Sequence, residues 1–198
     1  MRFNYIANAI GLLLVDIGFM IFIPLVVALI FQEWQCAVAF FAAALLSLAV
    51  GDILRKAEKR SKSEDSLNDI KRTEALVVAS LAWISFGLVA CIPFLFNGFS
   101  FIDSFFESVS GITTTGATIL TSFDIPKSLL FWRSFMQWLG GMGIIVLFIA
   151  IMPQFAVAGR QMFFAEAPGP TEEKFTPRIK STASSLWKIY AEIGRAHV

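Results

Sequence analysis

The sequence predicts an all-α integral membrane protein, and three observations support this fold class. Of its 198 residues, 57% are hydrophobic, and the mean hydropathy is +0.71, whereas soluble domains are about 45–50% apolar. Lysine and arginine gather in alternate connections between the apolar segments, as short cytoplasmic loops do. Each of four apolar segments has roughly the 20 residues that a helix needs to cross a bilayer: 5–31, 36–54, 75–96 and 128–152.

The first two segments predict a helical hairpin, because only residues 32–35 separate them. The first segment is too long for the apolar region of a signal peptide and lacks a small-residue cleavage site. Asp16 lies inside this segment, and a carboxylate at membrane depth is a functional candidate. A water-filled cavity and a partner helix are both open as the surroundings of Asp16.

The basic residues predict the orientation in the membrane. Seven lie between the second and third segments: Arg55, Lys56, Lys59, Arg60, Lys62, Lys71 and Arg72. Four more follow the fourth segment: Arg160, Lys174, Arg178 and Lys180. Both connections are therefore expected in the cytoplasm, and with four spans the N-terminus lies there too. The net charge of +1 gives no indication of nucleic acid as a partner.

The connection over residues 99–125 is unusually apolar, yet it is too short to cross the membrane and return as two helices. We predict a re-entrant segment that begins with a short helix from Phe101 to about Gly111. Such a helix is roughly 16 Å long, about half the hydrocarbon thickness. Asp103 would complement the helix dipole in the first turn, and the C-terminal end would point partial negative charge toward the membrane centre.

The threonine–glycine segment, residues 110–118 (SGITTTGAT), follows this helix. Unwound backbone at membrane depth is tolerated only where protein covers it or where it faces water. Successive carbonyls of a threonine run ending in Gly116 can point toward one axis, and a ring of carbonyls can replace the water shell of a cation. Glycine takes the positive φ that this needs. A plainer interpretation is a helix break whose hydroxyls satisfy the local backbone.

Further motifs accompany this segment in a fixed order: 103–108 (DSFFES) before it, then 131–133 (FWR), 137–145 (QWLGGMGII) and 165–170 (AEAPGP). The ordered set resembles the Trk-type potassium uptake transporters, in the superfamily that includes Ktr and HKT. The resemblance covers nearly all of residues 1–190. It implies potassium uptake across the bacterial inner membrane through four membrane–pore–membrane units, with this chain supplying one quarter of a carbonyl-lined selectivity filter.

The resemblance places the ion against Thr114, Thr115 and Gly116, with potassium at the backbone oxygens of Thr114 and Thr115. Thr113, Glu107 and Asp103 are expected to support the filter and pore.

Two interpretations stay open for each acid of the pore helix. Asp103 and Glu107 are four residues apart and share one helix face. Glu107 either braces the filter by accepting backbone hydrogen bonds or is a buried, satisfied carboxylate. Asp103 either adds negative potential at an outer mouth or is only a charge in the first helical turn. Arg133 is expected to reach the membrane interface or to pair with an acid such as Asp124.

The resemblance also implies the lipid bilayer, the remaining pore units, a second copy in a homodimer and a cytosolic nucleotide-binding regulatory subunit as partners. Residues of this chain show no nucleotide motif, no cofactor site and no nucleophile with a base, so we expect no enzyme. Cys36 and Cys91 fall in apolar segments and are expected to pack there. The alternatives are a sodium-preferring relative, against which Gly116 argues, and a membrane scaffold that transports nothing.

The expected organisation has four parts. Residues 1–71 form the transmembrane hairpin and a basic cytoplasmic loop, and 72–153 form the first membrane–pore–membrane unit. Residues 154–192 form a cytoplasmic link and the start of a truncated second unit. Residues 193–198 are expected to be a non-native tail, which is left out of the fold. The glycines at 140, 141 and 143 serve either close helix packing or a hinge.

Overall fold

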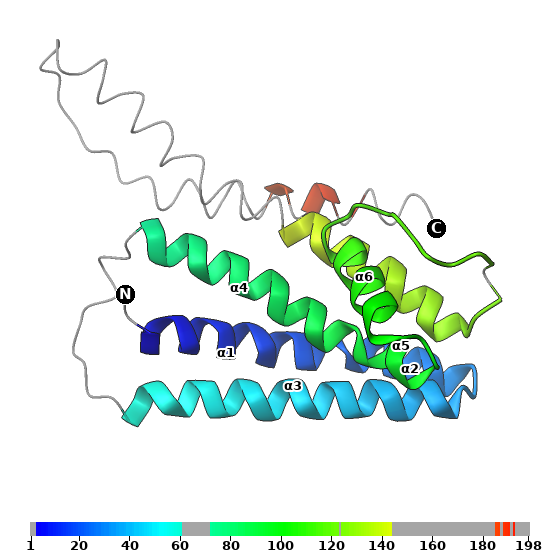
Figure 1. Ribbon diagram of the computed structural model, residues 1–198, viewed down its shortest axis with the longest axis horizontal. Coiled ribbons are helices and arrows are strands. Elements are labelled where there is room, and N and C mark those ends of the chain that lie inside the picture. The colour runs from blue at the N-terminus through cyan, green and yellow to red at the C-terminus, as the bar shows by residue number, and fades with distance from the viewer. Residues whose placement is uncertain are drawn as a thin grey trace, which may run out of the picture. The chain divides into compact units, whose positions relative to one another are not determined.

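The computed structural model describes residues 3–60, 72–122, 124–143, 185–186, 188–190 and 192, and the regular structure in these ranges is entirely helical (Figure 1). The chain divides into two compact units, Met1–Gln137 and Trp138–Val198. The first unit contains α1 (Phe3–Met20), α2 (Phe22–Ile30), α3 (Trp34–Arg60), α4 (Arg72–Ala90), α5 (Ile92–Phe96) and α6 (Phe101–Ile112). A further helix covers residues 127–143, and residues 185–186, 188–190 and 192 are also helical.

Three helical stretches are long and apolar enough to cross a membrane: Ile6–Ile30, Trp34–Lys56 and Leu76–Phe96. They confirm the first three predicted segments. Of the fourth, residues 128–143 are helical, and its remainder lies outside the described residues. So do most of the basic loop, nearly all of the predicted link and the predicted tail over 193–198.

Two of the three stretches contain a break near a proline. Proline has no N–H and its ring clashes with the preceding turn of a helix. The first stretch is interrupted at Ile21, three residues before Pro24, and the third at Cys91, two residues before Pro93. These breaks separate α1 from α2 and α4 from α5.

The break at Cys91 frees a backbone acceptor that another helix uses. The Phe94 N–H donates to the Cys91 oxygen over 3.1 Å, whereas in a continuous α-helix it would donate to the Ala90 oxygen. The Ala90 oxygen instead accepts the indole N–H of Trp132 over 3.1 Å. The Trp132 ring is fully buried; it stacks on Phe86 and meets Phe40 edge-on, with centroid distances of 6.4 and 5.9 Å. Residues of α3, α4 and the 127–143 helix therefore meet at one tryptophan.

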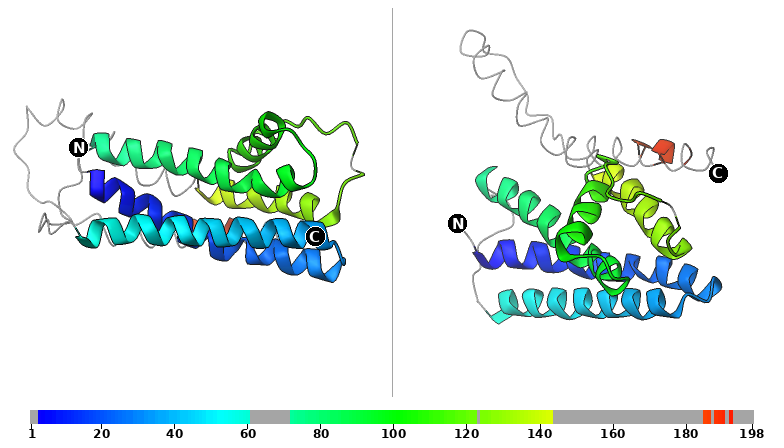
Figure 2. Two further views of the ribbon diagram at one scale, coloured as in Figure 1. Left: turned by 60° about the horizontal axis from the view of Figure 1, so that its bottom comes forward. Right: turned by 45° about the vertical axis from the view of Figure 1, so that its right-hand side comes forward.

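The helices α1 and α3 lie side by side and antiparallel (Figures 1 and 2). The two backbones come close together at Gly11 and Gly51, where a methyl group added to either glycine would lie 2.8 Å from the carbonyl oxygen of the other. The hydroxyl of Ser47 donates to the Leu14 oxygen over 2.6 Å in the same interface. Small residues permit this approach, and a hydroxyl bond across the helices adds to it. The predicted N-terminal hairpin is therefore present.

The close approach of α1 and α3 predicts that Gly51→Ala destabilises the protein. Its methyl group would meet the Gly11 carbonyl and push the helices apart, so we expect the free energy of unfolding to fall by about 1–3 kcal/mol. The measurement is the melting temperature of the purified protein in detergent. Val50→Ala is the control, because the neighbouring Val50 side chain is exposed. Equal melting temperatures for the two variants would contradict the prediction.

Candidate functional site

The helix α6 begins with a capping arrangement at Ser100. The Ser100 Oγ accepts the backbone N–H of Asp103 over 3.2 Å, and its hydroxyl donates to Asp103 Oδ2 over 2.7 Å. The first of these bonds gives the Asp103 N–H an acceptor at a helix start, where N–H groups have no intrahelical partner, and the second holds the Asp103 side chain against the cap. The Asp103 carboxylate is thereby held in the first turn, where its charge complements the helix dipole.

The helix α6 ends at Ile112, before the three threonines. The Thr115 N–H donates to the Ser110 oxygen and the Thr114 N–H to the Gly111 oxygen, each over 3.0 Å. Thr114 has φ +58°, which is the left-handed conformation of a Schellman-type helix end, a position that glycine usually occupies. A β-branched residue in that conformation is a genuine outlier and costs about 1–2 kcal/mol. Sequence reasoning did not anticipate this strain.

Beyond this helix end the backbone is irregular. Gly116 has φ +74°, the positive φ for which a glycine was expected at this position. The Ser110 hydroxyl donates to the Ala117 oxygen over 2.6 Å and holds the segment against α6. The hydroxyl of Thr113 donates to the Val109 oxygen over 2.8 Å. Hydroxyls in this segment therefore satisfy part of the local backbone, as the plainer interpretation of its composition also expects.

The carbonyl oxygens at the centre of the segment are the candidate ion ligands. Among the residues that the structure describes, no hydrogen bond ends on the carbonyl oxygens of Thr113, Thr114 or Thr115. The residues from Thr114 to Gly116 are exposed. Within the described ranges, no three histidine, cysteine, aspartate or glutamate side chains gather where they could hold a metal ion.

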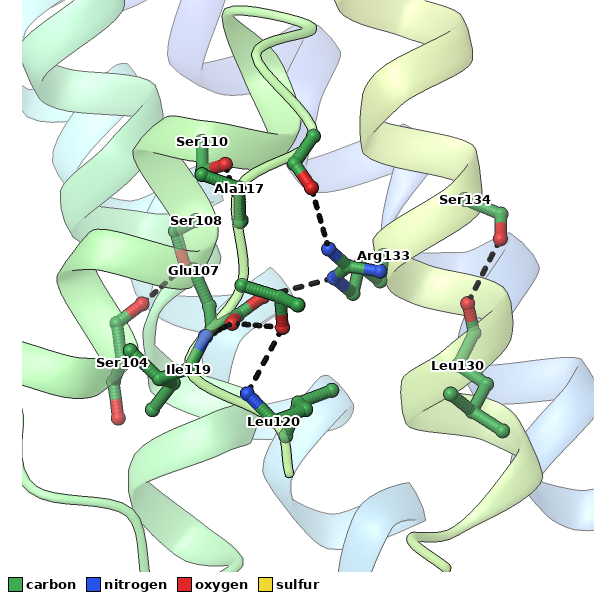
Figure 3. A network of polar contacts seen from close by, with 12 residues as sticks. Ser104, Glu107, Ser108, Ser110, Ala117, Ile119, Leu120, Leu130, Arg133 and Ser134 are labelled. Atoms are coloured by element: carbon green, nitrogen blue, oxygen red, sulfur yellow. Dashed lines mark hydrogen bonds and ion pairs between the residues drawn. The ribbon is translucent and has the colours of Figure 1, made fainter. Parts of the chain in front are cut away.

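The Glu107 carboxylate links α6 to the chain beyond the segment (Figure 3). It is fully buried. Its Oε1 accepts the Ile119 N–H over 2.6 Å and the Thr118 hydroxyl over 2.5 Å. Its Oε2 accepts Arg133 Nε over 2.8 Å. Both carboxylate oxygens therefore accept hydrogen bonds, one from the irregular segment and the other from the helix that follows it.

The Arg133 guanidinium faces the irregular segment from the 127–143 helix. Besides Glu107, its Nη2 lies 3.4 Å from the Gly116 oxygen, and the side chain is only 15% exposed. The expected pairing of Arg133 with an acid is therefore confirmed, but the acid is Glu107 rather than the example Asp124. Asp124 is exposed to water, whereas the buried Glu107 carboxylate needs an opposite charge.

The structure thus places Thr113 and the Thr114–Gly116 backbone directly after the C-terminal end of α6, Glu107 in the middle of this helix and Asp103 in its first turn. Sequence reasoning missed Ser110 and Thr118 as anchors of the segment. Their positions could have indicated this role, because each has a hydroxyl group next to backbone that leaves the helix. Asp16 lies elsewhere, exposed on α1.

Comparison with known proteins gives the family. The chain matches TrkH, described as a cation transport protein, over residues 36–196. The Trk system potassium uptake protein TrkH of Salmonella typhimurium is 41% identical and that of Escherichia coli K12 is 40% identical, each over 195 residues. Both alignments cover 96% of this chain but 39% of the relative.

A second protein of E. coli K12, the Trk system potassium uptake protein TrkG, is 33% identical over 178 residues, which are 87% of this chain and 36% of that protein. The chain therefore spans about two fifths of the length of these curated relatives. Since the match extends over most of the chain and these relatives exceed 30% identity, the chain belongs to the TrkH family of cation transport proteins.

Proposed function

We propose that this chain supplies one of four parts of a potassium uptake pathway in the bacterial inner membrane, with backbone oxygens of Thr114, Thr115 and Gly116 as ion ligands. The observation that carries the proposal is the end of α6 at Ile112. The carbonyls of Thr113, Thr114 and Thr115 after it accept no described hydrogen bond, whereas the Gly116 oxygen lies 3.4 Å from Arg133 Nη2. In the proposal, the other three parts come from the remainder of a full-length protein.

The short helix α6 fits a re-entrant pore helix in length and polarity. Its 12 residues span about 18 Å, well under the hydrocarbon thickness of about 30 Å. Its C-terminal end carries partial negative charge and lies next to the threonine–glycine segment. A cation at this end would exchange hydration water for carbonyl oxygens. A membrane potential that is negative inside drives entry with about 2.3 kcal/mol per charge per 100 mV.

The side chains around the segment fit a supporting role in this proposal. Glu107 holds the backbone at Ile119, and Arg133 approaches the Gly116 oxygen. Thr113 ties its hydroxyl to the last turn of α6, and Asp103 adds a negative charge at the outer end of that helix. The filter proposed here has one glycine per unit, whereas potassium channels have two. We therefore expect fewer rigid ion sites than in a potassium channel and only moderate discrimination between potassium and sodium.

The proposed setting extends to location and partners. The relatives are named as proteins of a Trk system, which supports further components. In this proposal the chain crosses the membrane several times with its N-terminus in the cytoplasm. It forms a homodimer and binds a cytosolic nucleotide-binding regulatory subunit. Potassium is the transported ligand here, and no cofactor takes part.

The proposal predicts that Gly116→Ser in the full-length gene lowers potassium selectivity. Serine at φ +74° strains the backbone by about 1–2 kcal/mol and displaces the carbonyls proposed to coordinate potassium. The ratio of potassium to sodium flux should therefore fall, by at most roughly tenfold, which is the factor that about 1.4 kcal/mol represents. The measurements are growth of a potassium-uptake-deficient strain at low potassium and the ratio of rubidium to sodium flux.

Gly98→Ser is the matched control for this substitution. Gly98 has φ +88°, and at both glycines an added methyl group would meet no atom within 4 Å. The backbone strain is therefore similar, but Gly98 lies outside the threonine–glycine segment. If both variants keep the wild-type flux ratio, or lose it equally, the filter assignment is wrong.

The buried ion pair generates a second prediction. Glu107→Gln leaves Arg133 without its opposite charge, so we expect a loss of about 3 kcal/mol of stability and reduced rubidium uptake. Glu107→Gln combined with Arg133→Gln removes both charges and should recover part of the loss. The melting temperatures of the single and double variants measure the coupling. Strictly additive losses would show that the pair contributes nothing to holding the segment.

A further inference from the structure

The turn between α2 and α3 and the first residues of α3, together residues 31–36, contact both ends of the connection that contains α6; we call this region the hairpin tip. Its first set of contacts is with the end of α5. The Gln35 side-chain amide donates to the Phe96 oxygen over 2.6 Å, and the Cys36 Sγ donates to Asn97 Oδ1 over 3.3 Å. Residues 96 and 97 lie just before α6, so the hairpin tip fixes the chain where it enters this connection.

The second set of contacts is with the start of the 127–143 helix. Glu33 Oε1 accepts the Lys127 N–H over 2.7 Å, and Oε2 accepts the Ser128 N–H over 2.9 Å as well as the Ser128 hydroxyl. The Lys127 Nζ also lies 4.8 Å from the centroid of the Phe31 ring. The first N–H groups of a helix have no intrahelical acceptor. A carboxylate 94 residues away in the sequence therefore caps this helix.

The charge of Glu33 suits this position. Burial raises the pKa of the Glu33 carboxyl, but the hydrogen bonds from Ser128 and Lys127 and the Lys127 charge outweigh burial, so its pKa is lowered. A carboxylate at a helix N-terminus also complements the helix dipole. The cap is therefore complete at neutral pH, and it is lost only as the pH falls through the lowered pKa.

We propose that the hairpin tip is a clasp that positions the ion filter, with Glu33 as a positioning residue acting through the 127–143 helix. This inference rests on the proposed potassium pathway. Arg133 lies six residues after Lys127, about 9 Å along the axis of a stiff helix. A displacement of the capped first turn is therefore transmitted to the Arg133 contacts with Glu107 and the Gly116 oxygen. The peripheral hairpin thus sets the geometry of the segment without touching the ion.

The test uses the full-length protein carrying Glu33→Gln. The substitution keeps the side-chain shape but removes the charge and one acceptor oxygen, so one backbone N–H loses its partner. We expect the ratio of rubidium to sodium flux, at equal amounts of protein in the membrane, to fall about three- to tenfold, the range expected for a lost helix cap. Ser128→Ala should lower it less, and the double variant should fall no further than Glu33→Gln alone.

Asp124→Asn is the control, because it removes an exposed carboxylate from the same connection. Its flux ratio should equal that of the wild type. An unchanged ratio in Glu33→Gln, even with less protein in the membrane, overturns the clasp and leaves the potassium pathway standing. If Glu33→Gln does not reach the membrane, an unchanged ratio in Ser128→Ala overturns it equally. A wild-type protein without rubidium flux overturns the proposed pathway and the clasp together.

Discussion

The arrangement around the threonine–glycine segment depends on one buried carboxylate. Glu107 is fully buried, and its two oxygens accept hydrogen bonds from Ile119 and from Arg133. Because a buried charge is costly unless it is paired and hydrogen-bonded, these two partners are fixed relative to α6 and to each other. The segment has no regular ladder of its own. Its shape follows from this carboxylate, from the Ser110 bond to Ala117 and from the approach of Arg133 to Gly116.

The strain at Thr114 is the local consequence of this restraint. The helix α6 ends in a left-handed residue, and here that residue is threonine at φ +58° rather than glycine. Strained conformations persist only where surrounding contacts determine them, and they cluster at functional sites. Two hydroxyl bonds hold the chain around Thr114. Thr113 donates to the Val109 oxygen before it, and Ser110 donates to the Ala117 oxygen beyond it. A glycine at 114 would relax the backbone but would also loosen the segment.

Local patterns predicted the helices, while contacts between distant residues escaped prediction. Three apolar segments and the short helix from Phe101 are confirmed, because length and composition decide them within one stretch of chain. The bonds from Glu107 to Arg133 and from Glu33 to Ser128 join residues 26 and 95 positions apart, and no local pattern states which acid meets which helix. One signal was present. Pro126, directly before the 127–143 helix, has no side-chain acceptor, so a side-chain cap for this helix has to come from another residue.

Two irregularities in the described part of the chain leave backbone groups without a helical partner, and a neighbouring element satisfies them in each case. The Ala90 oxygen freed at Cys91 accepts the Trp132 indole N–H, and the first N–H groups of the 127–143 helix donate to Glu33. Lipid offers no hydrogen bonds, so a membrane protein must satisfy such groups internally. Within the described part of the chain, the carbonyl oxygens of residues 113–115 are not satisfied in this way. Residues 114–116 are exposed, so a ligand from outside the segment can reach their oxygens, and in the proposed pathway that ligand is a cation held jointly with other pore units.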